Sequence, residues 1–119
     1  YTVDLAGHRL DLPGIYEWRI EGTGAYIGKS MRLRKRFDEY PNNVRKLMMR
    51  LPYRKSKPDG FRVVHRHLHA ALGLDNVPTI TLTVLENCPL CQLHERESFW
   101  IESRRKEAAA GGLQVLNST

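Results

Sequence analysis

The sequence predicts a single α+β domain over residues 1–119, with a small three-stranded, mainly antiparallel sheet flanked by about four helices. Two short extended segments near the N-terminus are separated by a glycine-containing turn, and a third extended segment follows later in the chain. Apolar residues recur at helical spacing around these segments. A chain of 119 residues, 41% of them hydrophobic, has the size and composition of one globular domain.

The two N-terminal extended segments predict a hairpin. Residues 14–20 (GIYEWRI) are apolar and aromatic, and residues 21–24 (EGTG) supply the glycines of a turn. Residues 25–28 then resume an extended apolar run. We therefore expect these segments to pair as neighbouring antiparallel strands.

Helical spacing begins directly after the hairpin. Ser30 is a candidate N-cap, because its hydroxyl can accept a backbone N–H of the first turn. Leu33, Phe37 and Tyr40 fall on one helical face. Pro41 is expected to end this helix, since proline lacks the N–H that a helix interior needs.

The same patterns predict the rest of the chain. Helices are expected at residues 43–50, 61–72 and 92–106, where apolar residues recur at spacings of three and four. Residues 78–86 (PTITLTVLE) alternate threonine with apolar residues, which is typical of a strand with one buried side. A basic loop is expected at 52–60 and a short extended tail at 113–117.

Positive charge is concentrated in the first half of the chain. The net charge is +6, and residues 1–60 hold 13 basic and 7 acidic side chains. From Lys29 to Lys57, eleven basic residues meet only two acidic ones. A polyanion such as nucleic acid is the natural partner of such a patch, because neutralised phosphates release their counterions. A solvated basic surface is the alternative interpretation.

No apolar stretch approaches the roughly 18 residues that a membrane span needs, and residues 1–12 lack the layout of a signal peptide. We therefore expect a soluble protein with no membrane partner and no small-molecule cofactor. Two cysteines are too few for a disulfide scaffold, which indicates a reducing compartment, the cytoplasm. The chain does not begin with methionine, so a removed tag or further chain is expected before it.

Cys88 and Cys91 form a C-x-x-C pair that His94 follows. Structural zinc needs four ligands, so these residues supply at most three of them. A zinc-stabilised interaction domain is therefore an alternative that requires a further ligand from elsewhere in the chain. The candidates are His65, His67 and His69.

Two tripeptides lie in the predicted hairpin: GIY at 14–16 and YIG at 26–28, nine residues apart. On neighbouring strands, Tyr16 and Tyr26 can place both phenols on one face. The alternative is that both are amphipathic strand residues with hydrated hydroxyls. The pattern resembles the signature of the GIY-YIG nucleases, and the resemblance implies that family's fold along nearly the whole chain.

The resemblance extends to the first helix and to the chain end. Arg36 and Tyr40 match the family's helix arginine and its histidine or tyrosine, and their spacing puts both on one helical face. Alternatively, Arg36 is a surface cation and Tyr40 a core residue. Lys29 follows YIG directly, as is common in the family, and Asn117 matches the asparagine that closes the pattern. Among the three histidines, His65 is the first candidate for the family's histidine position.

Glu97 lies on an apolar stripe with Leu93, Trp100 and Ile101. Burying an unpaired carboxylate is costly, so such a residue pairs with a cation or binds a metal. The resemblance implies that Glu97 is the family's metal-binding glutamate and holds Mg²⁺ or Mn²⁺. An ion pair, for instance with Arg36, is the alternative.

The resemblance implies a metal-dependent nuclease that hydrolyses phosphodiester bonds in DNA. In this interpretation Tyr16 is the general base, and Tyr26 and Tyr40 orient water and phosphate. A phenol with a pKa near 10 needs nearby positive charge to act as a base at neutral pH. A catalytically silent nucleic-acid-binding module is the alternative function. The nucleic-acid contacts are expected at Lys29, Arg32, Arg36, Arg54, Lys55 and Lys57.

Overall fold

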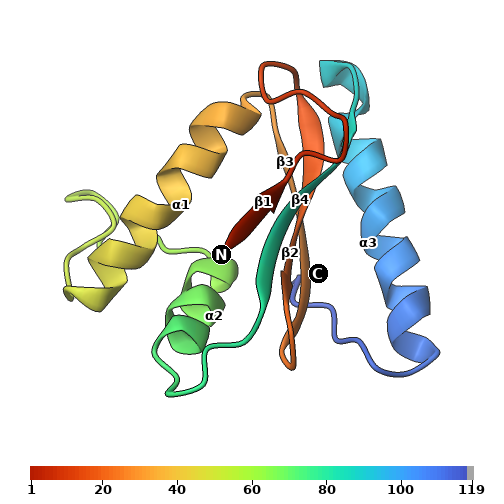
Figure 1. Ribbon diagram of the computed structural model, residues 1–119. Coiled ribbons are helices and arrows are strands. Elements are labelled where there is room, and N and C mark those ends of the chain that lie inside the picture. The colour runs from red at the N-terminus through yellow and green to blue at the C-terminus, as the bar shows by residue number, and fades with distance from the viewer. Residues whose placement is uncertain (118–119) are drawn as a thin grey trace.

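The computed structural model describes residues 1–117. A four-stranded mixed sheet lies between two helical layers, with α1 and α2 on one side and α3 on the other (Figure 1). None of the helices within these residues is long and apolar enough to cross a membrane. The elements in chain order are β1 (Thr2–Asp4), β2 (Gly14–Ile20), β3 (Gly24–Ser30), α1 (Leu33–Met48), α2 (Val63–Leu72), β4 (Ile80–Asn87), the short 3-10 helix η1 (Leu90–Gln92) and α3 (Leu93–Ala109).

The strands are ordered β1-β4-β2-β3. β2 pairs antiparallel with both β3 and β4, and β1 pairs parallel with β4. The predicted hairpin is therefore confirmed, with Tyr16 opposite Gly28 and Trp18 opposite Tyr26. Directly paired residues point to the same side of a sheet, so these four residues share one face.

β2 is buried on both faces. Tyr16 and Trp18 point toward α1 and α2 and join their apolar residues in the larger core cluster. Ile15 points the other way and packs with Leu93 of α3 in a second cluster. The helical stripe expected around Phe37 is buried in the larger cluster, as predicted. The two helical layers are thus needed to cover one central strand.

The predicted helix break at Pro41 is wrong, because one helix, α1, runs from Leu33 to Met48 with Pro41 inside it. Proline in a helix interior costs about 3 kcal/mol. Phe37, Tyr40 and Val44 lie on the buried side of the continuous helix, and each large apolar side chain gains about 1.5–3 kcal/mol on burial. Packing on both sides of the proline therefore outweighs the lost hydrogen bond. The structure has three α-helices where about four were expected.

The sheet has four strands rather than the predicted three, because β1 was not expected. Its three residues are exposed and show no apolar alternation, and the strand pairs with β4, far along the chain. Tyr1, just before β1, packs edge-on against Trp18 with ring centroids 4.7 Å apart. Ser30 does not cap α1, which begins at Leu33; its Oγ accepts the backbone N–H of Arg32 at 3.0 Å. The other predicted elements are confirmed to within a few residues.

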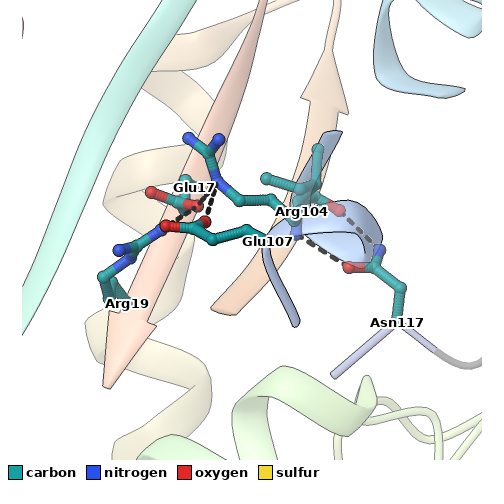
Figure 2. A network of polar contacts seen from close by, with 6 residues as sticks. Glu17, Arg19, Arg104, Glu107 and Asn117 are labelled. Carbon is teal, nitrogen blue, oxygen red and sulfur yellow. Dashed lines mark hydrogen bonds and ion pairs between the residues drawn. The ribbon is translucent and has the colours of Figure 1, made fainter. Parts of the chain in front are cut away.

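The extended tail at residues 113–117 lies along β3. The backbone N–H of Ala25 donates to the carbonyl of Gln114, and the N–H of Leu116 donates to the carbonyl of Ala25, both at 2.8 Å. The Asn117 side chain accepts the Ile27 N–H at 2.9 Å and donates to the Ile27 carbonyl at 2.8 Å (Figure 2). The tail thus covers the edge of β3 as far as Ile27.

Gly28 follows this covered stretch and faces the Tyr16 ring across the hairpin. A Cβ atom at position 28 would collide with the end of that ring, the nearest atoms being its Cζ, hydroxyl and Cε2. The missing side chain therefore lets the Tyr16 phenol lie directly against β3.

We expect Gly28→Ala to lower the free energy of unfolding by about 1–3 kcal/mol, because a well-packed aromatic ring must shift. Gly73→Ala is the matched control, since Gly73 has φ −85° and its nearest neighbour to a new Cβ is 3.5 Å away. Urea unfolding of both variants measures the difference. Equal stability of the two would contradict the close packing of Tyr16 on Gly28.

Candidate active site

Two phenols and a guanidinium meet on the side of the sheet that α1 covers. The Tyr16 and Tyr40 hydroxyl oxygens lie 2.7 Å apart, and Arg36 Nη1 donates to the Tyr16 hydroxyl at 3.4 Å. Tyr16 has no exposed surface, and Tyr40 is 1% exposed. Tyr16 comes from β2, whereas Arg36 and Tyr40 come from one face of α1, as their spacing predicted.

The environment keeps two of these groups in defined protonation states. Burial, followed by the neighbouring Tyr16, raises the pKa of Tyr40 well above 10, so Tyr40 keeps its proton. Burial acts to lower the pKa of Arg36, but Tyr16 and Tyr40 raise it more, so Arg36 stays a cation. The Tyr16 oxygen therefore faces two groups that can donate to it, which is the arrangement that stabilises negative charge on an oxygen.

Tyr26 of β3 lies on the same face of the sheet as this cluster. It is only partly buried, and burial raises its pKa, with a further upward contribution from Tyr16. Glu97 also acts to raise the pKa of Tyr26, whereas Arg62 and Arg36 act to lower it. The Tyr26 hydroxyl is thus within the electrostatic reach of both the tyrosine cluster and Glu97.

Glu97 of α3 forms an ion pair with Lys29 of β3. Lys29 Nζ lies 3.3 Å from Glu97 Oε1 and 3.5 Å from His94 Nδ1. The Glu97 side chain is 20% exposed, so its carboxylate is partly and not fully buried. The ion pair that was the alternative to a metal at Glu97 therefore exists, with Lys29 rather than Arg36 as the cation.

Glu97 is the only candidate metal ligand that the sequence named at this site, and its carboxylate fits a magnesium ion. Within residues 1–117 its Oε2 atom forms no hydrogen bond, so it can bind a cation while Oε1 stays paired. The same residues contain no group of three His, Cys, Asp or Glu side chains placed to hold a metal. Mg²⁺ is commonly held by one or two carboxylates, waters and substrate phosphates, which suits a lone carboxylate.

His65 has a structural environment in α2. Its Nδ1 accepts the backbone N–H of Arg62 at 3.0 Å, and its Nε2 lies 3.5 Å from the side-chain amide of Asn43. Its ring packs against Tyr40 with centroids 5.2 Å apart. Burial, followed by the charges of Arg62 and Arg36, lowers the pKa of His65 to about 4. His65 is therefore neutral at pH 7 and holds the start of α2 against Tyr40.

The remaining predicted residues are not part of the cluster. Both polar atoms of the Asn117 side-chain amide form hydrogen bonds with the Ile27 backbone, which gives Asn117 a structural role. Arg32 is exposed just before α1. The three cations predicted in the basic loop are also exposed, at Arg54, Lys55 and Lys57.

The cysteines and the α2 histidines lie on opposite sides of the sheet. Cys88 is buried in the cluster under α3, and Cys91 is exposed. Val64 and Leu68 place α2 in the cluster on the other side. The fold therefore does not bring the α2 histidines to the C-x-x-C pair, as a zinc site would require.

Buried charge fixes α3 against the sheet. Glu17 of β2, 6% exposed, pairs with Arg104 of α3 and, at 3.3 Å, with Arg19 (Figure 2). Arg19 also reaches Glu107 of α3 at 3.4 Å. Removing one partner of a buried pair costs about 3–5 kcal/mol, so this network holds α3, and with it Glu97, in place.

Arg62 is a charged neighbour of this site that the sequence did not indicate. Its charge acts on Tyr26 and Tyr40, which belong to other elements, and on His65, three residues further along the chain. The sequence signal available was its position directly before the helix that carries His65.

Comparisons of the chain with protein-family models, curated proteins and solved structures find no match.

We expect His65 to make stability depend on pH. Its folded-state pKa of about 4 lies below the usual 6.5, so its contribution is complete above pH 6.5 and is lost as pH falls from 6.5 to 4. The loss amounts to about 3 kcal/mol. His65→Gln does not titrate, and its side chain can still accept the Arg62 N–H. Urea unfolding between pH 4 and 6.5 should show that the free energy of unfolding depends less on pH in the variant than in the parent. The same pH dependence in both proteins would contradict the role assigned to His65.

Proposed function

We propose that the chain is a metal-dependent nuclease of the GIY-YIG type that hydrolyses phosphodiester bonds in DNA. The observation that carries the proposal is the hydrogen-bonded set of Tyr16, Tyr40 and Arg36 on one side of β3, together with the Lys29–Glu97 ion pair on its other side. The resemblance assigns Tyr16, Arg36, Tyr40 and Glu97 to the family's pattern, together with Tyr26 and Lys29. Their positions on the two sides of β3 support a common task.

In the proposed reaction, Arg36 binds the scissile phosphate and stabilises the charge that develops on it. A preorganised donor of this kind is worth about 3 kcal/mol of barrier. Lys29 lies on the other side of β3 and can neutralise a second phosphate oxygen. The two cations therefore offer contacts to a phosphate from both sides of the edge strand.

Glu97 would hold the metal, and Lys29 would keep the carboxylate oriented through Oε1. When bound, Mg²⁺ or Mn²⁺ supplies a Lewis acid for a phosphate oxygen and the leaving 3′ oxygen. Within this scheme the chain's own task is to keep one carboxylate oxygen of Glu97 available for the metal.

Tyr16 is the proposed general base, and Arg36 and Tyr40 stabilise its phenolate by donating to its oxygen. Tyr16 has no exposed surface, whereas Tyr26 is partly exposed. We therefore assign Tyr26 the contact with the attacking water at the surface of the site, from which the water's proton would have to pass to the Tyr16 oxygen. Tyr26 is also the competing base.

The catalytically silent binding module remains the second candidate, favoured by the full burial of Tyr16. Incubation of the chain with labelled single- and double-stranded DNA and RNA, in Mg²⁺, Mn²⁺ or EDTA, separates the two. Cleavage that requires the metal supports the nuclease. Binding without cleavage in every metal supports the module.

We expect Glu97→Gln to lower metal-dependent cleavage at least about a hundredfold, because it removes the proposed anchor of the cation while nearly keeping the side chain's shape. Glu95→Gln is the matched control, since Glu95 is exposed on the same turn of α3. Cleavage of a labelled oligonucleotide measures both. A Glu97→Gln variant within about tenfold of the parent would show that this carboxylate is not the anchor.

We expect Tyr16→Phe and Arg36→Ala each to reduce the cleavage rate roughly a hundredfold, with much smaller losses in nucleic-acid binding, because both act on the transition state. Arg34→Ala, an exposed arginine of the same helix, should leave the rate unchanged. Single-turnover rates and binding in EDTA give the two readouts. A fully active Tyr16→Phe together with an inactive Tyr26→Phe would move the base to Tyr26.

A further inference from the structure

A groove of about 730 Å³ lies beside the proposed site, between the start of α1 and the segment where η1 leads into α3. It begins at Lys29 and Arg36, which the proposed function places on the scissile phosphate, and continues over the surface of the first turn of α1. Its charged and titratable lining consists of Lys29, Arg32, Lys35, Arg36, Glu39 and His94.

The charge of this groove differs from that of a second hollow that adjoins it at the start of α1. The second hollow shares Met31, Arg32, Lys35 and Glu39 with the first but adds Arg34 and two acidic residues. Its three basic side chains thus face three carboxylates, whereas the groove beside the site has four basic side chains against one carboxylate. A polyanion leaving the proposed site is therefore drawn along the first groove and not the second.

Two of the four cations that line the groove, Arg32 and Lys35, are not engaged elsewhere. The other two are engaged: Lys29 is paired with Glu97, and Arg36 donates to Tyr16. Arg32 and Lys35 are exposed, and neither forms an ion pair with a carboxylate in the part of the chain that the structure describes. They lie three positions apart at the start of α1, so both can contact neighbouring phosphates of one strand.

The groove also carries exposed apolar side chains. Met31 is 66% exposed and Leu90 58% exposed, and both belong to its lining. Phosphate contacts need no apolar partner. Leucine and methionine are among the side chains that proteins insert beside unstacked bases. Large apolar surface among cations therefore fits a strand with at least one unstacked base, as in single-stranded or locally unpaired nucleic acid.

We propose that this groove binds one unpaired nucleic-acid strand, with its phosphates on Arg32 and Lys35 and one unstacked base against Met31 and Leu90. The inference rests on the proposed function and adds a substrate class to it: single-stranded or locally unpaired nucleic acid. The next phosphate of the strand then reaches Arg36 at the site of cleavage.

The first test is binding in EDTA, where no metal-dependent cleavage occurs. Fluorescence anisotropy with the full chain compares labelled single-stranded DNA and RNA oligonucleotides with duplexes of the same sequence. We expect the single strands to bind at least about tenfold more tightly than their duplexes. Equal or tighter binding of the duplexes overturns the inference, as does the absence of binding to any probe.

The apolar contacts are tested with Met31→Ala combined with Leu90→Ala. The double variant should lose at least about tenfold in affinity for the single strand and stay within about twofold of the parent for the duplex. Met48→Ala combined with Met49→Ala is the control, because these residues are similarly exposed at the other end of α1. Parental affinity of the Met31 and Leu90 variant for single strands overturns the inference.

The phosphate contacts are tested with Arg32→Ala combined with Lys35→Ala. Each lost contact to a single strand lowers the slope of log affinity against log salt by about 0.7, so we expect a decrease of about 1.4. Arg34→Ala, which lines only the second hollow, should leave the slope unchanged. An unchanged slope in the Arg32 and Lys35 variant overturns the inference.

Binding and cleavage keep the two proposals apart. A chain that cuts nucleic acid but whose binding does not respond to these variants retains the nuclease function and loses the groove. A chain that binds single strands through the groove but cuts nothing in Mg²⁺ or Mn²⁺ retains the groove and loses the nuclease function.

Discussion

The protein depends on β2, a strand with neither face open to water. It lies between β3 and β4 in the sheet, and its alternating side chains enter two different cores. One of those side chains is Glu17, a carboxylate that is stable there because Arg104 of α3 pairs with it. Covering β2 therefore requires helices on both sides and specifies where α3 must dock.

The proposed site follows from this arrangement, because it forms around the edge strand next to β2. Tyr16 and Arg36 approach from the side of α1, whereas Lys29 and Glu97 meet on the side of α3. Because Gly28 has no side chain, the Tyr16 phenol can lie directly against β3. Two sets of polar groups on opposite sides of a sheet can thus act on one ligand at its edge, without a deep cavity in the core.

The sequence allowed prediction of those features that depend on neighbours along the chain. The hairpin and the buried stripe through Phe37 follow local patterns, and both are confirmed. The expected helix break at Pro41 does not occur, because tertiary packing stabilises the continuous helix. β1 was not predicted, because the strand it pairs with, β4, lies far along the chain. For Glu97 the stripe predicted a paired or metal-bound carboxylate, but the identity of Lys29 as the partner depends on how α3 docks on β3.

The contact of Asn117 with Ile27 also has a consequence for self-association. An uncovered sheet edge offers backbone donors and acceptors to any other strand, including the same strand of another molecule. Here the tail occupies the β3 edge up to Ile27, and the opposite edge is formed by the very short β1. Proteolytic loss of residues 114–117 would expose the backbone edge of β3 to the β3 strand of another molecule. The tail therefore prevents edge-to-edge aggregation of the folded protein.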